Sequence, residues 1–198
     1  MIQIINTGVA NIRSLQAAFD RLGRKWNLTE RAADIENASH VVLPGVGAFE
    51  AAASALDRLN LRKPIVNRIN CPDAPTLCIC LGMQLLCQSS EESGSAVGLG
   101  ILPHTIRRFS HAVTVPQLGW NNVQPMTEGP LASGEAYFAN SFRLAEPPSG
   151  WGFAQTQYDG TFVSSVWRGR TLACQFHPEL SGNWGQQVLT HWIEGTTC

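Results

Sequence analysis

The chain has 198 residues, of which 44% are hydrophobic and 15% are charged, and its formal net charge at pH 7 is −1. A chain of this length buries roughly 70% of its unfolded surface in one globular domain, so we expect residues 1–198 to form a single domain. The near-zero charge and the absence of Lys or Arg runs argue against a nucleic-acid groove and against a polybasic membrane patch.

The first residues predict the compartment. The stretch MIQIINTGVAN (1–11) lacks the basic start, the long apolar run and the small-residue cleavage site of a signal peptide. No apolar run in the chain approaches the roughly 20 residues that span a bilayer. We therefore expect a cytoplasmic protein whose six cysteines are reduced.

The first half of the chain predicts strands that alternate with helices. A strand over 1–6 is followed by a helix that begins after Asn11, a suitable N-cap, and ends at Gly23. Its apolar residues recur with helical spacing at Ile12, Leu15, Phe19 and Leu22. Further elements are strands over 26–29, 40–43 and 76–81, a helix over 48–59 and a helix from Gly82. This alternation indicates a parallel sheet that is covered on both faces.

The second half of the chain has a different pattern. Strand-like segments occupy 113–115, 136–144, 152–158, 161–167 and 171–176, and a last helix is predicted over 183–193. Hairpin turns are predicted at Asp159-Gly160 and at 168–170. The predicted fold is a three-layer α/β/α sandwich with a mostly parallel central sheet and an antiparallel extension.

The stretch TLCICLGMQLL (76–86) places a thiol where a strand gives way to a helix. An apolar strand, a cysteine, any residue and a helix-starting glycine are typical of a nucleophile elbow, a sharp turn that lifts one side chain clear of the sheet. The unpaired N–H groups of the helix favour a thiolate at Cys80 and can hold an oxyanion. Gly82 is small, as the turn requires, but Cys78 occupies the place of the usual glycine before it. We predict that Cys78 is buried and not catalytic.

Two other interpretations of this stretch stay open. Cys80 can be a small core residue, as free cysteines often are. Cys78 and Cys80 can also be read as a Cys-x-Cys metal site, but no second Cys or His pair has a fitting spacing, so we expect no metal. The remaining cysteines are expected to be packing or surface residues: Cys71, Cys87, Cys174 and Cys198.

His177-Pro178-Glu179 supplies the partner groups that a catalytic thiol needs. In an extended segment His177 and Glu179 project to the same side, so the carboxylate can hold the imidazole in the tautomer that faces Cys80. By itself this tripeptide is a weak signal and is more typical of a solvated loop. Together with the elbow it favours a Cys–His–Glu triad.

Several motifs resemble those of class I glutamine amidotransferases and, more closely, of the glutaminase subunits of imidazole glycerol phosphate synthases. CLGMQLL (80–86) is typical of the whole superfamily. The other motifs that carry the resemblance are TGVANIRSLQAAFDRLG (7–23), LPGVGAF (43–49), SSEES (89–93), GLGILP (98–103), VPQLGWNNV (115–123), YFANSF (137–142) and QFHPELSG (175–182). The combination of GVAN (8–11), PGVG (44–47) and PQLGWN (116–121) is the more specific to these subunits. The resemblance covers nearly the whole chain and implies the flavodoxin-like fold of that family.

The resemblance implies roles for individual residues. The nucleophile is Cys80, its base is His177 and the orienting acid is Glu179. Glutamine is bound by Gln84, Glu92 and main-chain groups of Ser141 and Phe142. The oxyanion site comprises Gly45, Val46, Gly47 and Leu81, and rotation of a peptide in this segment couples hydrolysis to the partner. The partner face is expected to include Asn11, Trp120, Asn121 and Leu180, although core packing is an equally good interpretation of Trp120.

The resemblance also implies the reaction. The chain is expected to hydrolyse L-glutamine and to deliver ammonia to a (βα)8-barrel cyclase in a heterodimer, without a cofactor, nucleic acid or membrane. The cyclase then makes imidazole glycerol phosphate and aminoimidazole-carboxamide ribotide in histidine biosynthesis. Two alternatives stay open: a glutaminase subunit of another ammonia-channelling synthase, for a surface sugar or pyridoxal phosphate, and a non-catalytic scaffold of the same fold.

Three positions depart from the family pattern besides Cys78. Leu180 occupies a place where lysine or arginine commonly pairs with the cyclase, so the contact is either apolar or made with a different partner. Gln117 and Asn140 stand where histidine is frequent. PQLGWN (116–121) is absent from the pyridoxal phosphate glutaminases and therefore favours the histidine pathway.

Overall fold

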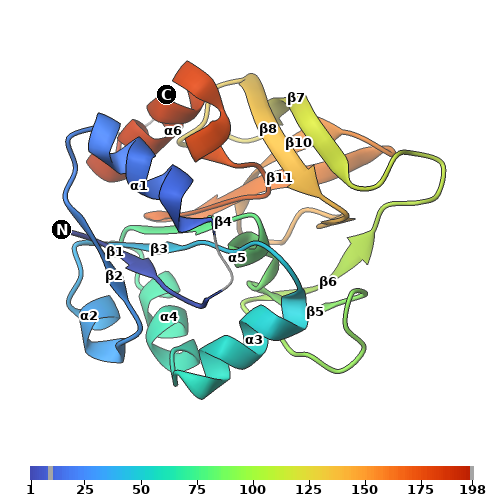
Figure 1. Cartoon of the computed structure of the whole chain (residues 1–198). Helices are drawn as coiled ribbons and strands as arrows, with labels where there is room; N and C mark the ends of the chain where they lie inside the picture. Colours follow the sequence, from blue (N-terminus) through green and yellow to red (C-terminus); the bar gives the residue numbers. More distant parts are fainter. Residues whose placement is uncertain (9–10, 197–198) are drawn as a thin grey trace.

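The computed structural model describes residues 1–8 and 11–196 of the chain (Figure 1). Over these residues, nine strands form one large sheet and three strands form a smaller one. Helices cover both faces of the large sheet, which confirms the predicted three-layer α/β/α fold. No helix within the described residues is both long enough and apolar enough to cross a membrane.

One half of the large sheet is parallel. In the order β2-β1-β3-β4-β12, each strand runs parallel to its neighbours. The strands are β1 (Ile2–Ile5), β2 (Trp26–Thr29), β3 (His40–Leu43), β4 (Thr76–Ile79) and β12 (Thr171–Cys174). β1, β4 and β12 are buried at every residue, as is usual for strands covered on both faces.

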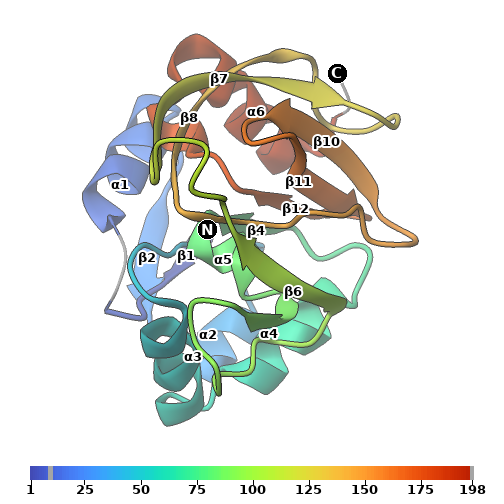
Figure 2. The ribbon, with the colours of Figure 1, turned by 90° about the vertical axis from the view of Figure 1, so that its right-hand side faces the viewer.

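The other half of the large sheet is antiparallel. Beyond β12 the order continues β11-β10-β7-β8, and every neighbouring pair in this part is antiparallel. The strands are β7 (Gln117–Pro125), β8 (Gly134–Asn140), β10 (Gly152–Gln157) and β11 (Thr161–Arg168). Figure 2 shows β7 and β8 at the end of the sheet that lies farthest from α2–α4.

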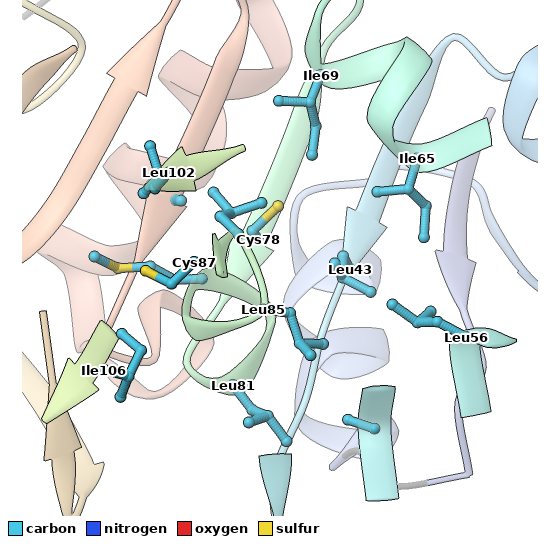
Figure 3. Packing of buried hydrophobic residues seen from close by; sticks show 14 of the residues in the cluster. Leu43, Leu56, Ile65, Ile69, Cys78, Leu81, Leu85, Cys87, Leu102 and Ile106 are labelled. Atoms are coloured by element: carbon cyan, nitrogen blue, oxygen red, sulfur yellow. The ribbon is translucent and has the colours of Figure 1, made fainter. Parts of the chain in front are cut away.

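The helices divide between the two faces of the sheet. α1 (Ile12–Arg21) and α6 (Gly182–Glu194) pack on one face, and α2 (Ala32–Glu36), α3 (Phe49–Arg58) and α4 (Arg62–Ile69) pack on the other (Figure 1). The single turn α5 (Leu81–Gln84) directly follows β4. Figure 3 shows side chains of α4 and α5 packed against Leu43 of β3 and Cys78 of β4.

The small sheet lies on the same side as α3 and α4. It consists of β5 (Cys87–Ser90), β6 (Leu102–Arg108) and β9 (Phe142–Arg143). Leu102 and Ile106 of β6 belong to the same buried cluster as the inner faces of α3 and α4 (Figures 2 and 3). This arrangement places the loop after β5 close to the first turn of α3.

The structure corrects the predicted elements of the second half. The strand predicted over 113–115 is wrong: these residues form an irregular segment with bends before Pro116, which has no N–H to donate to a ladder. The real strand, β7, was missed because exposed Leu118 and Trp120 conceal its alternating pattern. The segment 136–144 is divided at Ser141 between two sheets. β5, β6, α2 and α4 were also not predicted.

The predicted helix after Asn11 is confirmed as α1, but its capping differs from the prediction. The Asn11 side chain makes no capping bond, and its Nδ2 donates to Ser14 Oγ at 3.0 Å. Gly23 follows the helix with φ at +63°, a conformation that favours glycine, so the predicted stop is confirmed. Val9 and Ala10 of the preceding motif lie outside the described residues.

Candidate active site

Cys80 lies in a strained turn between β4 and α5. Its φ is +53°, which is unusual for a residue with a side chain, and its N–H donates to Cys174 O at 2.7 Å. A methyl group at Gly82 would come within 2.0 Å of the Leu43 carbonyl oxygen, so only glycine lets α5 pack this closely on β3. The geometry agrees with the nucleophile elbow predicted from the sequence.

The turn separates the two cysteines of the Cys-x-Cys pattern. Cys78 packs in the buried cluster beneath α3 and α4, whereas Cys80 belongs to the cluster on the opposite face of the sheet. Burial raises the pKa of the Cys78 thiol to about 12, which keeps it protonated and unreactive at neutral pH. The prediction that Cys78 is buried is confirmed.

The other predicted packing or surface cysteines divide as expected. Cys71 is exposed, and Cys87 and Cys174 are buried free thiols. Cys198 lies outside the described residues.

His177 and Glu179 form a buried pair beside Cys80. The distance from His177 Nδ1 to Glu179 Oε1 is 2.8 Å, and the two residues are only 5% and 8% exposed. Burial lowers the pKa of His177, but hydrogen bonds with Cys80 and Glu179 outweigh it and raise the pKa to about 10. The imidazole is therefore held between the sulfur and the carboxylate, and the solvated-loop interpretation of this tripeptide is wrong.

A ring of hydrogen bonds fixes the segment that carries His177. The segment is not extended throughout, because Pro178–Leu180 form a 3₁₀ helix, η1. The His177 N–H donates to Tyr137 O at 2.9 Å, and the Tyr137 N–H donates to Ser181 Oγ at 3.0 Å. The Ser181 hydroxyl in turn donates to His177 O at 2.6 Å. The main chain of the imidazole-bearing residue is thus attached to β8.

A cavity of about 240 Å³ opens beside the sulfur. It brings together most of the residues to which the sequence assigned catalysis, glutamine binding or the oxyanion site. Its lining consists of Val46, Gly47, Cys80, Leu81, Gln84, Glu92, Ala139, Asn140, Ser141, Phe142 and His177. Parallel and antiparallel halves of the sheet both contribute to this wall.

Gln175 contacts the sulfur and was missed by the sequence analysis. It is fully buried, its Nε2 lies 3.6 Å from Cys80 Sγ, and its Oε1 accepts a bond of 3.0 Å from Gln84 Nε2. Gln84 Nε2 also lies 3.3 Å from Phe142 O. The only signal in the sequence was the position of Gln175 in the strand that leads to His177.

The expected oxyanion site is closed in this conformation. The Leu81 N–H, predicted to stabilise an oxyanion, donates instead to the Gly45 carbonyl oxygen at 3.3 Å. Gly47, two residues later, has φ at +94°, which favours glycine. The Gly45 carbonyl group therefore points at the N–H that the sequence assigned to the oxyanion site.

Glu92 approaches the cavity from the loop after β5. Its Oε2 accepts a hydrogen bond of 2.8 Å from the Phe49 N–H, the first residue of α3. The carboxylate therefore lies between the cavity and the start of a helix.

The predicted partner-face residues do not all share one surface. Trp120 is 57% exposed, so its interpretation as a core residue is wrong, and its ring makes an edge contact with Tyr137. Leu180 is 37% exposed on η1, and exposed Asn11 precedes α1, which packs against η1. Asn121 points to the other face of β7, where its Nδ2 donates to Gln157 O.

Comparisons with known proteins agree with this arrangement. A family model described as "Glutamine amidotransferase class-I" matches residues 3–193. The chain is 38% identical to the imidazole glycerol phosphate synthase subunit HisH of Oceanobacillus iheyensis, covering 98% of each chain, and 36% identical to that of Herpetosiphon aurantiacus, covering 98% of this chain and 94% of the relative.

Two further matches extend the comparison. The chloroplastic imidazole glycerol phosphate synthase hisHF of Arabidopsis thaliana is 35% identical over 98% of this chain, which corresponds to 34% of the longer plant protein. A crystal structure of a glutamine amidotransferase superposes with a TM-score of 0.78 at 16% identity, covering 98% of this chain and 97% of the other.

Proposed function

Because the chain belongs to the class-I glutamine amidotransferases and, among them, to the HisH subunits of imidazole glycerol phosphate synthase, we propose that the cavity beside Cys80 hydrolyses L-glutamine to glutamate and ammonia. The family membership makes the chain an enzyme subunit of histidine biosynthesis. The observation that carries the proposal is the meeting, at one cavity, of a strained thiol with a buried imidazole–carboxylate pair.

In the proposed first step, the Cys80 sulfur attacks the side-chain amide carbon of glutamine. The thiol proton passes to His177, which delivers it to the departing nitrogen, so that ammonia leaves and a glutamyl thioester forms. Glu179 stabilises the imidazolium and fixes its tautomer through the 2.8 Å bond at Nδ1. The triad thus divides one difficult hydrolysis into two acyl transfers.

In the second step, His177 takes a proton from a water molecule that attacks the thioester carbonyl carbon. Glutamate leaves and the proton returns to the Cys80 sulfur, so the sum of the two steps is glutamine plus water giving glutamate plus ammonia. Gln175 supports both steps, because its Nε2 donates toward the sulfur and stabilises negative charge there.

The cavity wall supplies complementary groups for the amino-acid end of the substrate. Glu92 presents a carboxylate to the α-ammonium group, and Gln84 presents its amide to the same end of glutamine. Main-chain groups of Ser141 and Phe142 receive the α-carboxylate. The negative charge of Glu92 favours substrates with a free amino group over simple amides.

Hydrolysis also requires the oxyanion site to open. In the observed conformation the Leu81 N–H donates its hydrogen bond to the Gly45 carbonyl oxygen. A negatively charged tetrahedral intermediate would therefore face this carbonyl oxygen instead of the N–H donor that would stabilise it. We infer that binding of the partner subunit turns the Gly45–Val46 peptide and directs the Val46 N–H into the cavity. The isolated subunit is then expected to be nearly inactive.

The partner is proposed to be a (βα)8-barrel cyclase that receives the ammonia. In the Arabidopsis relative, the region similar to this chain is about a third of one longer synthase. The surface proposed to bind the cyclase is apolar and exposed, and comprises Val46, Leu118, Trp120 and Leu180. Leu180 cannot form an ion pair, so we propose an apolar contact at this position, and Asn11 and Asn121 stay predicted members of the interface.

The test is to purify the chain with the cyclase and to measure glutaminase activity with and without the cyclase's nucleotide ligand. The expected outcome is a low basal rate, strong activation in the complex, and covalent labelling of Cys80 by an electrophilic glutamine analogue, located by mass spectrometry. Labelling of Cys80 together with failure to bind the cyclase would instead indicate a different ammonia-channelling synthase. A complex that neither hydrolyses glutamine nor is labelled would support a non-catalytic scaffold.

A further inference from the structure

The first turn of α3 has no cap of its own. The residue at its N-cap position is Ala48, which has no side-chain acceptor, yet the N–H groups of a first helical turn lack partners within the helix. Glu92, from a different part of the chain, supplies the acceptor: its Oε2 receives the Phe49 N–H at 2.8 Å. A carboxylate at this place is also favoured by the helix dipole.

The loop that carries Glu92 is firmly attached on its other side. Glu91 Oε1 accepts a bond of 2.7 Å from Arg107, Glu91 Oε2 accepts one of 2.9 Å from the Arg108 N–H, and the Glu91 N–H donates to Ile106 O. The bonds from the Arg108 N–H and the Arg107 side chain lower the pKa of Glu91, so this anchor stays charged at neutral pH. Glu92 therefore extends from a fixed base on β6 to α3.

We define the oxyanion loop as residues 45–48. Glu92 binds Phe49, the first residue of α3, which directly follows this loop. At one end of this loop, Gly45 O accepts the Leu81 N–H, and at the other end Phe49 is held by Glu92. Val46 and Gly47, between these two attachments, line the cavity. Any rotation of the Gly45–Val46 peptide therefore takes place against an end that Glu92 fixes.

We propose that Glu92 is a positioning residue for the oxyanion loop in addition to its proposed contact with substrate. A carboxylate has two oxygens, and within the described residues only Oε2 has a protein hydrogen-bond partner. Oε1 is therefore available to the α-ammonium group while Oε2 holds Phe49. One carboxylate thus connects occupancy of the substrate site to the geometry of Val46. This inference rests on the proposed glutaminase function. It means that Glu92 affects kcat, through the oxyanion loop, as well as KM, through its contact with the substrate.

Two variants separate the two roles. Glu92→Gln removes the negative charge but keeps an oxygen that accepts the Phe49 N–H, so it should raise KM for glutamine and leave kcat within about threefold. Glu92→Ala removes both, so it should also lower kcat by roughly tenfold or more, since small displacements of catalytic groups are costly. Glu50→Gln is the matched control, because it removes the same charge one residue into α3, leaves the Phe49 N–H bond to Glu92 in place and keeps an oxygen for the 3.4 Å bond from Ser93 Oγ.

The decisive measurement uses a substrate without the ammonium group, 4-carbamoylbutanoate, on the complex with the cyclase. With this substrate Glu92 has no substrate charge to bind. The proposal expects kcat of Glu92→Ala to be reduced by roughly tenfold or more relative to wild type, while wild type and Glu50→Gln agree within about threefold. Equal rates for wild type and Glu92→Ala would overturn it.

A backbone variant covers the case in which Glu92→Ala does not fold or the deaminated substrate is too slow. Replacing Phe49 by phenyllactate changes the amide to an ester, which deletes the N–H donor and keeps both the buried side chain and Glu92. The expected result is a lower kcat for glutamine with an unchanged KM, and an unchanged kcat contradicts the proposal. In every case, labelling of wild-type Cys80 by the glutamine analogue is measured first, because failure there refutes the glutaminase function instead.

Discussion

The parallel and antiparallel halves of the large sheet contribute differently to the site. The parallel half consists of short strands, of which β1 and β4 are buried at every residue, and it ends in the strained turn at Cys80. The antiparallel half consists of longer strands, and its strand β7 has an outer face that is exposed and apolar at Leu118 and Trp120. The proposed nucleophile therefore follows a fully buried strand of the parallel half, and the proposed recognition surface lies on an exposed face of the antiparallel half.

The two halves meet at β12, which pairs in parallel with β4 on one side and antiparallel with β11 on the other. Cys80 follows β4 and His177 follows β12, so the parallel register of these strands places their carboxyl ends side by side. Changes at this junction should therefore affect chemistry, changes in the parallel half should affect stability, and changes on the outer antiparallel face should affect the partner.

The largest expected effect is at the junction. Cys80→Ala should lower the glutaminase rate of the complex by at least about 10⁴-fold with no change in folding, because the triad acts as a unit. Cys78→Ala, two residues earlier, should keep most of the activity, because its buried thiol is unreactive. A steady-state glutaminase assay with circular dichroism checks both variants, and an active Cys80→Ala enzyme together with an inactive Cys78→Ala enzyme reverses the assignment.

The next largest effect is expected on the stability of the parallel half. Gly82→Ala should destabilise the fold by about 3 kcal/mol or more, because the new methyl group would lie 2.0 Å from a backbone oxygen that cannot move aside. Gly94→Ala is the control, since no atom lies within 4 Å of the added methyl group there. Urea unfolding measures both free energies, and equal values for the two variants contradict the close packing of α5 on β3.

A smaller effect is expected on the outer face of the antiparallel half. Leu118→Asp should weaken binding of the cyclase by about tenfold or more and leave the melting temperature unchanged, because Leu118 is 66% exposed in the free subunit. Asn122→Asp introduces the same charge on the same face of β7 and should have little effect. Isothermal titration calorimetry gives both affinities, and equal losses would mean that net charge, not the apolar surface, controls binding.

The subtlest expected effect is a pH dependence at the junction. The pKa of His177 is raised to about 10, above its unfolded value of 6.5, so the imidazole stays protonated in the folded protein between these two pH values. The stability from this group is complete below about pH 6.5 and is lost as pH rises toward 10, by at most about 1.4 kcal/mol per pH unit. In urea unfolding, the stability advantage of wild type over His177→Asn should therefore shrink with rising pH, whereas a constant difference refutes the raised pKa.

The same contrast between the halves explains what the sequence could predict. The predicted strands 26–29 and 40–43 coincide with β2 and β3. β3 is a short apolar run that ends at Pro44-Gly45, a pattern that predicts a strand without tertiary information. In the antiparallel half, β7 was missed because its exposed side carries apolar residues that serve a surface, not the core. Apolar residues on the exposed face of β7 hide the alternation of polar and apolar residues by which a strand is predicted.

For the site, predictability depended on how far apart the interacting residues lie in the sequence. His177 and Glu179 are two residues apart, so their contact could be predicted from the tripeptide alone. The 2.8 Å distance from His177 Nδ1 to Glu179 Oε1 confirms this contact. The contacts of Glu92 with Phe49 and of Gln175 with Cys80 join segments distant in the chain. The closed state of the Leu81 N–H is a backbone property that residue types do not encode.

The ring of bonds among His177, Tyr137 and Ser181 has a consequence for hydrogen exchange. The amide protons of His177 and Tyr137 are both engaged in this ring, so neither can exchange with solvent while the ring stays closed. Their deuterium uptake should proceed at one common rate, set by the detachment of the 177–181 segment from β8. Replacing the Ser181 hydroxyl removes the acceptor of the Tyr137 N–H and should release both protons together. The imidazole that we propose as the general base would then lose its attachment to β8.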